Sequence, residues 1–156
     1  MTGKTRGEFT LSTDRADQQP ERIHAYLTRS YWAEGIPLSV VRRSIEGSLC
    51  FGIFTKGEQV AFARAVTDSA TFAYHADVYV LEEYRGRGLA KWMMEEILAH
   101  PQLQGLRRFA LATRDAHSLY ARYGFTPLAM PQSFMEIRRK DVYGRKASGG
   151  APPGQG

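Results

Sequence analysis

One segment combines three kinds of local signal: Val78-Tyr-Val-Leu-Glu-Glu-Tyr-Arg85-Gly86-Arg87-Gly88-Leu89-Ala90. Its first residues favour a strand, its glycines a turn, and its end the start of a helix. Backbone N–H groups at a helix start have no intrahelical partner, lie at the positive end of the helix dipole, and are approached closely where glycine leaves out the Cβ atom. The two arginines add positive charge. The segment therefore predicts an anion site. The same sequence is also compatible with a helix start that binds no ligand and has two solvated arginines.

Two other phosphate motifs do not fit. The dinucleotide fingerprint GxGxxG requires a glycine where this chain has Lys91, and the strands before the segment look like hairpins. Gly3-Lys4-Thr5 resembles the end of a P-loop, but no glycine can lie five residues before Gly3 and no strand precedes it. These nucleotide folds are therefore excluded.

On the N-terminal side of the segment, apolar periodicity changes from helical to strand-like. Helices are expected from Asp17 to near Gly35 and over 37–46, where apolar residues recur at helical spacing. Strands are expected over 9–12, 49–55, 59–67 and 72–80, which are rich in β-branched and aromatic residues and are separated by turn residues. A meander of the last three strands accounts for this pattern.

On the C-terminal side, a helix is expected over 89–98, a strand over 108–112, and a further helix that ends at Gly124. Strands over 125–130 and 134–137 then complete the domain. The prediction is one α+β domain over 9–140, with a mixed sheet and flanking helices. Residues 144–156 contain no apolar residue larger than alanine and are expected to form a flexible Gly/Pro-rich tail.

Composition narrows the class of protein. The chain has 156 residues, of which 43% are hydrophobic and 24% are charged, as in ordinary globular domains. No apolar run is long enough for a membrane span and the N-terminus lacks an apolar leader, so a cytoplasmic protein without membrane partners is expected. The single cysteine, Cys50, excludes intrachain disulfides and multi-thiolate metal sites, and no metal is expected. The net charge of +5 favours an anionic partner.

Two motifs carry a family resemblance. Arg85-Gly-Arg-Gly88-Leu-Ala90 resembles the [QR]-x-x-G-x-[GA] signature of the GNAT superfamily of acetyl-CoA-dependent N-acetyltransferases. Downstream, Ala116-His-Ser-Leu119-Tyr120-Ala-Arg-Tyr-Gly124-Phe125 is similar to the A-x-x-L-Y-x-x-x-G-F segment of that family. The order of the expected elements agrees over 9–140. Thr113 departs from the pattern, because many members carry asparagine there.

The resemblance implies how the co-substrate is held. Acetyl-CoA would lie in a V-shaped gap between the strand ending at Val80 and the strand over 108–112, with the pantetheine arm beside Val78 and Val80. The pyrophosphate would rest on the turn, and Thr113 and Tyr120 would complete the site. The turn residues are Arg85, Gly86, Arg87, Gly88, Leu89 and Ala90.

The resemblance also implies direct attack of a primary amine, from a small molecule, peptide or protein, within a ternary complex. The Val80 N–H would stabilise the oxyanion, and Tyr120 would protonate the thiolate as general acid, since a phenol still carries its proton at neutral pH. Without the family pattern, Tyr120 reads as a half-buried aromatic residue of a helix. His75 and Asp77, expected on one strand face, are the candidate bases, although a strand histidine is more often structural.

The sequence says less about the acetyl acceptor and about protein partners than about the co-substrate. Trp32 could wall the acceptor pocket and Glu34 could attract a positively charged amine. Homodimerisation is possible. The alternative functions are a non-catalytic acyl-CoA-binding sensor or interaction module and a nucleic-acid-binding domain, for which no recognised motif appears.

Overall fold

The structure, a computed structural model, describes residues 3–143 and contains one six-stranded sheet in the order β1-β2-β3-β4-β5-β6. All neighbouring strands are antiparallel except β5 and β6, which are parallel. The strands are β1 (Lys4–Arg6), β2 (Phe9–Ser12), β3 (Leu49–Thr55), β4 (Glu58–Thr67), β5 (Phe72–Val80) and β6 (Arg108–Leu111). The predicted α+β class with a mixed sheet is confirmed.

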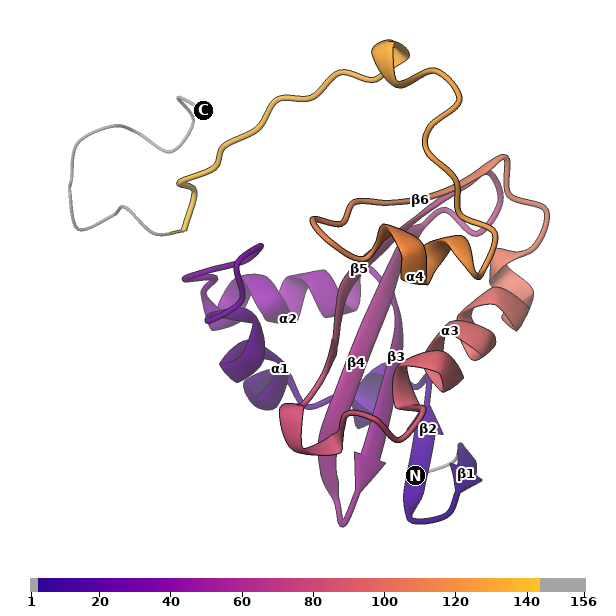
Figure 1. Cartoon of the computed structure of the whole chain (residues 1–156). Coiled ribbons are helices and arrows are strands. Elements are labelled where there is room, and N and C mark those ends of the chain that lie inside the picture. Colours follow the sequence, from indigo (N-terminus) through magenta and orange to yellow (C-terminus); the bar gives the residue numbers. More distant parts are fainter. Residues whose placement is uncertain (1–2, 144–156) are drawn as a thin grey trace.

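Helices lie on both faces of this sheet (Figure 1). One face is covered by α1 (Pro20–Leu27) and α2 (Leu38–Glu46), and the other by α3 (Leu89–Ala99), while the short α4 (His117–Ala121) follows β6. Short 3-10 turns occur at Arg15–Asp17, Glu82–Tyr84, Pro101–Leu103 and Pro131–Ser133. No helix among residues 3–143 combines the length and apolarity needed to cross a membrane.

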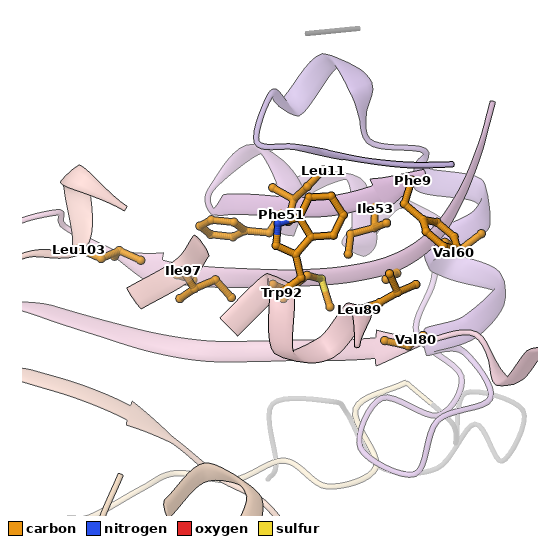
Figure 2. Packing of buried hydrophobic residues seen from close by; sticks show 14 of the residues in the cluster. Phe9, Leu11, Phe51, Ile53, Val60, Val80, Leu89, Trp92, Ile97 and Leu103 are labelled. Carbon is orange, nitrogen blue, oxygen red and sulfur yellow. The ribbon is translucent and has the colours of Figure 1, made fainter. Parts of the chain in front are cut away.

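Two apolar clusters hold these layers together. The larger cluster places Trp92 and Ile97 of α3 against Phe51 and Ile53 of β3, and all four side chains are buried (Figure 2). Burial of each such side chain contributes about 1.5–3 kcal/mol. The second cluster packs α1 and α2 on the opposite face around Phe62 of β4. The strand between these clusters, β5, is therefore fixed from both sides.

The N-terminal region differs from the prediction in two places. The first helix ends at Leu27 instead of continuing towards Gly35, because the Ser30 hydroxyl donates to the Leu27 carbonyl and accepts the Ala33 N–H, which forms a turn. An additional strand, β1, pairs with β2 through a turn in which Gly7 has a φ of +58°. This strand is short and exposed, so it carries no apolar alternation that sequence reasoning could detect.

The two predicted strands at the end of the domain are absent from the described residues. The chain after Gly124 is irregular apart from Pro131–Ser133, and it passes over the domain as an extended arm (Figure 1). Pro127 and Pro131 interrupt this segment, and proline has no N–H to give to a strand ladder. The predicted tail over 144–156 lies outside the described residues.

Candidate active site

A bulge in β5 shapes the centre of the site. Phe62 pairs with Tyr79 and Arg64 with Ala76, so one residue of β4 faces two residues of β5, Asp77 and Val78. Asp77 has a φ of +55°, which a residue with a side chain rarely adopts. Bulges of this kind bend a strand and redirect its side chains.

The bulge places His75 and Asp77 on opposite sheet faces, so the prediction that they share a face is wrong. His75 lies against Phe109 and Tyr120, whereas Asp77 contacts Trp32 of the α1–α2 loop. Strict alternation would place both side chains on one face, but the extra residue at Asp77–Val78 breaks the alternation. Both residues still line one cavity of about 530 Å³ at the sheet edge.

This cavity exists because β5 and β6 separate. Their parallel pairing covers only Phe72–His75 and Arg108–Leu111, after which β5 continues to Val80 without a partner on that side among the described residues. The edge of β5 beyond the pairing is therefore open. The predicted gap between these two strands is present, and the cavity borders it.

The Val80 amide faces the open side of β5. The next amide, that of Leu81, donates to the Val60 carbonyl of β4 over 2.9 Å. Successive peptide groups of an extended chain point to opposite sides, so the Val80 N–H points away from β4. The Val80 carbonyl shares this direction and accepts a hydrogen bond from Arg85 Nε at 2.9 Å.

The glycine turn leads directly from this strand end into α3. Gly86 and Gly88 have φ values of +80° and +79°, and a Cβ atom at either position would meet nothing within 4 Å. Backbone conformation, not crowding, therefore requires glycine there. Gly88 is the residue before α3 and has no side chain that could cap the helix. The Trp92 N–H donates to the Gly88 carbonyl at 3.0 Å, which is the first hydrogen bond of the helix. The first-turn amides of α3 therefore have no partner within the helix.

The two arginines of the turn make different contacts. Arg85 also donates to the Tyr26 hydroxyl at 3.0 Å, so its guanidinium bridges the turn, α1 and the end of β5. Arg87 is exposed, lies over the Tyr84 ring and forms a 3.7 Å ion pair with Glu8. Arg85 is thus held by the protein itself, whereas Arg87 supplies charge at the surface.

The remaining turn residues have distinct surroundings. Leu89 is buried in the core and fixes the start of α3, while Ala90 is exposed. Thr113 accepts the Ala116 N–H through its hydroxyl at 3.0 Å, in the turn before α4. Leu89 therefore anchors the backbone that could bind phosphate, and Thr113 orders the loop between β6 and α4.

Tyr120 projects from α4 into the cavity between β5 and β6. Its ring packs edge-on against His75 at 5.6 Å and Phe125 at 5.8 Å, measured between ring centroids. Burial, with a smaller contribution from the Tyr31 hydroxyl, raises the pKa of Tyr120 above its usual value near 10. The phenol therefore remains protonated at neutral pH and can donate a proton.

His75 is an uncharged group in an apolar setting. It is 4% exposed, and neither ring nitrogen has a hydrogen-bond partner among residues 3–143. Burial lowers the pKa of His75 from 6.5 to about 4, because the charged imidazolium would lose its hydration. A buried polar group without a partner is unusual in a folded protein, and this one lines the cavity beside Tyr120.

Asp77 is held by two donors. Arg64 Nε donates to its carboxylate at 2.7 Å in a largely buried ion pair, and the Trp32 indole donates at 2.9 Å. Arg64 also donates to the Ser48 hydroxyl at 3.0 Å. Sequence reasoning did not identify Arg64, although a charged residue in the otherwise apolar run of β4 was a detectable signal.

The two predicted acceptor residues separate in the structure. Trp32 and its neighbour Tyr31 line the cavity, and the Arg114 guanidinium lies 3.8 Å from the Tyr31 ring centroid. Glu34 is exposed and does not line it. Among the described residues, no group of three or more His, Cys, Asp or Glu side chains is arranged to hold a metal ion.

Comparison with known proteins gives a consistent result. The model of the acetyltransferase (GNAT) domain family matches residues 46–127, more than half of the chain. A candidate acetyltransferase of Gibberella zeae is 33% identical over 141 residues, which cover 76% of this chain and 78% of that protein.

Solved structures agree. A candidate GNAT-family acetyltransferase of Xanthomonas campestris pv. campestris is 55% identical, covers 87% of this chain and 96% of its own, and superposes with a TM-score of 0.85. A predicted acetyltransferase of Clostridium acetobutylicum, crystallised with acetyl-CoA, shares the fold at 15% identity and a TM-score of 0.60, over 83% of this chain and 94% of its own. With its sequence, sheet and strand-to-helix turn in agreement, the chain belongs to the GNAT family of acetyltransferases.

Proposed function

We propose that this protein transfers the acetyl group of acetyl-CoA to the nitrogen of a primary amine, by direct attack within a ternary complex. The observation that carries the proposal is the separation of β5 from β6, which leaves the Val80 N–H facing an open edge while Tyr120 lines the adjoining cavity. An oxyanion donor and a proton donor on one cleft are the two groups that acyl transfer from a thioester needs.

Acetyl-CoA is the proposed co-substrate, since the GNAT family uses it and the Clostridium acetobutylicum relative was crystallised with it. The pyrophosphate would rest on the backbone from Arg85 to Ala90, where the glycines and the first-turn amides of α3 meet. The pantetheine arm would extend along the open edge of β5 beside Val78 and Val80, using main-chain hydrogen bonds.

The reaction then needs few groups. The amine nitrogen attacks the thioester carbonyl carbon, a C–N bond forms, and the negative charge on oxygen is stabilised by the Val80 N–H. The C–S bond breaks as the carbonyl re-forms, and the departing sulfur takes the Tyr120 proton. The nitrogen gives up its extra proton, which returns to the Tyr120 phenolate, so the products are an N-acetyl amide and coenzyme A and the enzyme is restored.

The proton on nitrogen has two candidate acceptors in the protein. Asp77 is neutralised by Arg64 and bound by Trp32, and we assign it to fixing the bulge rather than to proton transfer. His75 packs against Tyr120 and has no competing partner among the described residues, but its pKa of about 4 makes it a weak base. We therefore infer that the amine enters in its free-base form and that His75 assists only after the C–N bond has formed.

The acceptor would enter beside Trp32 and Tyr31. Their exposed rings give an amine-bearing substrate a flat apolar wall, and Arg114 beside Tyr31 adds positive charge at the rim. A small-molecule, peptide or protein amine fits this wall. Glu34, outside the cavity lining, would act only on the approaching substrate.

The test compares two matched tyrosine variants. Tyr120→Phe removes the proposed general acid, whereas Tyr123→Phe makes the same change nearby, outside the cavity between β5 and β6. We expect Tyr120→Phe to lower kcat about 10²–10⁴-fold. The acetyl-CoA Kd, measured by calorimetry, should stay within twofold, and Tyr123→Phe should keep wild-type kcat.

Amine-dependent release of the coenzyme A thiol is the rate assay. Undiminished turnover by Tyr120→Phe would contradict the assignment of the acid. Acetyl-CoA binding without thiol release, across a panel of small amines and peptides, would instead favour the acyl-CoA sensor.

A further inference from the structure

Asp77 has a backbone conformation that is unusual inside a strand. Its φ is +55°, whereas the other two non-glycine residues with positive φ among residues 3–143, Lys56 and Ser69, lie in turns between strands. Glycine, asparagine and aspartate adopt this conformation with the least strain. The bulge therefore favours these three residue types at position 77.

The carboxylate of Asp77 accepts one hydrogen bond on each of its two oxygens. Oδ2 accepts from Arg64 Nε at 2.7 Å, and Oδ1 accepts from the Trp32 indole N–H at 2.9 Å. Glycine offers no acceptor, and the amide of asparagine has one oxygen and one NH₂ group, which can only donate. Of the three residue types, aspartate alone satisfies both donors.

The Arg64 side of this contact is anchored in the interior of the domain. The Arg64 and Asp77 side chains are 18% and 10% exposed, and Arg64 Nη1 donates to the Ser48 hydroxyl at 3.0 Å. Ser48 is buried, and its hydroxyl donates in turn to the Ser44 carbonyl of α2 at 2.6 Å. A chain of hydrogen bonds that begins on α2 therefore holds the Asp77 carboxylate in one orientation.

The Trp32 side of the contact is a surface loop. Trp32 is 41% exposed, and it packs edge-on against Tyr31 at 5.1 Å and tilted against Tyr26 at 6.4 Å, between ring centroids. The Trp32 and Tyr31 rings both line the cavity between β5 and β6. An exposed side chain has several rotamers available, and the hydrogen bond to Asp77 favours one of them. The orientation of this part of the cavity wall therefore depends on Asp77.

We propose that Asp77 is a positioning residue for the acetyl acceptor, an inference that rests on the proposed acetyl transfer to amines. Asp77 holds Trp32 as one wall of the acceptor site and takes no part in proton transfer. Because Asp77 lies in β5, three residues before Val80, the contact also fixes this wall relative to the strand edge beside which acetyl-CoA would bind. Arg64 acts through Asp77, by keeping its carboxylate aimed at Trp32.

Two substitutions separate the contact with Trp32 from the bulge itself. Asp77→Asn keeps the shape and a tolerated φ, but its single oxygen can serve only one donor, and the charged guanidinium of Arg64 should keep it. Asp77→Gly keeps the backbone conformation and removes both acceptors. Both variants should therefore release Trp32. Asp68→Asn makes the same change in the turn between β4 and β5, outside the cavity lining, and is the matched control.

Steady-state kinetics of amine-dependent thiol release give the first measurement. Asp77→Asn and Asp77→Gly should raise the amine KM several-fold, by the same factor as Trp32→Phe, while kcat and the acetyl-CoA Kd stay within about twofold of wild type. The double variant Asp77→Asn/Trp32→Phe should show no further increase, since both changes delete the same contact. Asp68→Asn should keep the wild-type KM.

Acrylamide quenching of tryptophan fluorescence reports the same contact without catalysis. The chain has two tryptophans, and Trp92 is 2% exposed, so the quencher acts mainly on Trp32. Quenching should increase in Asp77→Asn and Asp77→Gly, because a released indole is more accessible, and it should be unchanged in Asp68→Asn. Asp77→Gly leaves Arg64 without its carboxylate and is expected to be the less stable variant, so Asp77→Asn decides the test if Asp77→Gly does not fold.

The possible outcomes separate this proposal from the proposed function. An unchanged amine KM, or unchanged quenching, in folded Asp77 variants would overturn the positioning role. A fall in kcat with an unaltered KM would place Asp77 in the chemical step and would overturn it as well. No thiol release by the wild type would instead refute the proposed function, and quenching alone would then decide whether Asp77 holds Trp32.

Discussion

Replacing His75 by phenylalanine should change how stability depends on pH. The wild-type imidazole is buried between Phe109 and Tyr120, and burial lowers its pKa from 6.5 to about 4. Between these values the unfolded state binds more protons than the folded state, so stability is present above pH 6.5 and is lost as the pH falls towards 4. Phenylalanine keeps the ring contacts but cannot titrate.

The size of the effect follows from the two pKa values. With 6.5 unfolded and 4 folded, the His75 contribution between about pH 7 and about pH 4.5 amounts to a loss of about 2 kcal/mol. Carboxylates also change stability with pH. One is Asp68, whose pKa is lowered by hydrogen bonds from the Thr71 backbone and side chain and from nearby amides. Their contribution to the pH dependence is the same in wild type and in His75→Phe. The difference between the two pH slopes therefore isolates His75.

Urea unfolding at the two pH values gives this difference, and it is followed through tryptophan fluorescence, to which the buried Trp92 and the exposed Trp32 contribute. His75→Phe should lose about 2 kcal/mol less than wild type on acidification. Equal losses, with equal m-values, would refute the reasoning, because His75 would then titrate alike in the folded and unfolded states.

Three further changes test other parts of the site. Gly88→Ala places a side chain at a φ of +79°, which costs about 1–3 kcal/mol, and Gly57→Ala is the matched control with the same φ. Calorimetry should show weaker acetyl-CoA binding only for Gly88→Ala. Equal affinities of the two variants would contradict a role of the turn in acetyl-CoA binding. Trp32→Phe deletes the donor to Asp77 and should raise the amine KM several-fold in steady-state kinetics, with the acetyl-CoA Kd unchanged; an unaltered KM would contradict a role for this contact in acceptor binding. Cys50 should resist iodoacetamide at neutral pH, since burial raises its pKa to about 11, and mass spectrometry of native protein that shows fast modification would argue against that burial.

Local periodicity was sufficient to predict the elements that frame the site. The strand expected over 72–80 is β5, and the helix expected over 89–98 is α3, longer by one residue. Both have many apolar residues at regular spacing, and both end at glycine, proline or charged residues. The turn between them was predictable for the same reason, because Gly86 and Gly88 mark conformations that other residues rarely adopt.

Features that depend on distant partners were not predictable. The bulge at Asp77 arises from how β5 pairs with β4, where two residues of β5 lie opposite one residue of β4. The sequence of β5 alone does not indicate this pairing. The Arg64–Asp77 pair joins residues on adjacent strands, whose register sequence alone does not supply. The strand predicted over 134–137 has suitable residues, but this segment pairs with no strand of the sheet within residues 3–143.

The central claim is that the cleft between β5 and β6 binds acetyl-CoA and uses it to acetylate amines. Titrating acetyl-CoA into the purified protein in a calorimeter, and then adding an amine panel to the same sample, tests it most directly. Saturable binding of one acetyl-CoA per chain, followed by amine-dependent thiol release, is the expected result. No binding heat at any temperature tried, together with no thiol release, would contradict it.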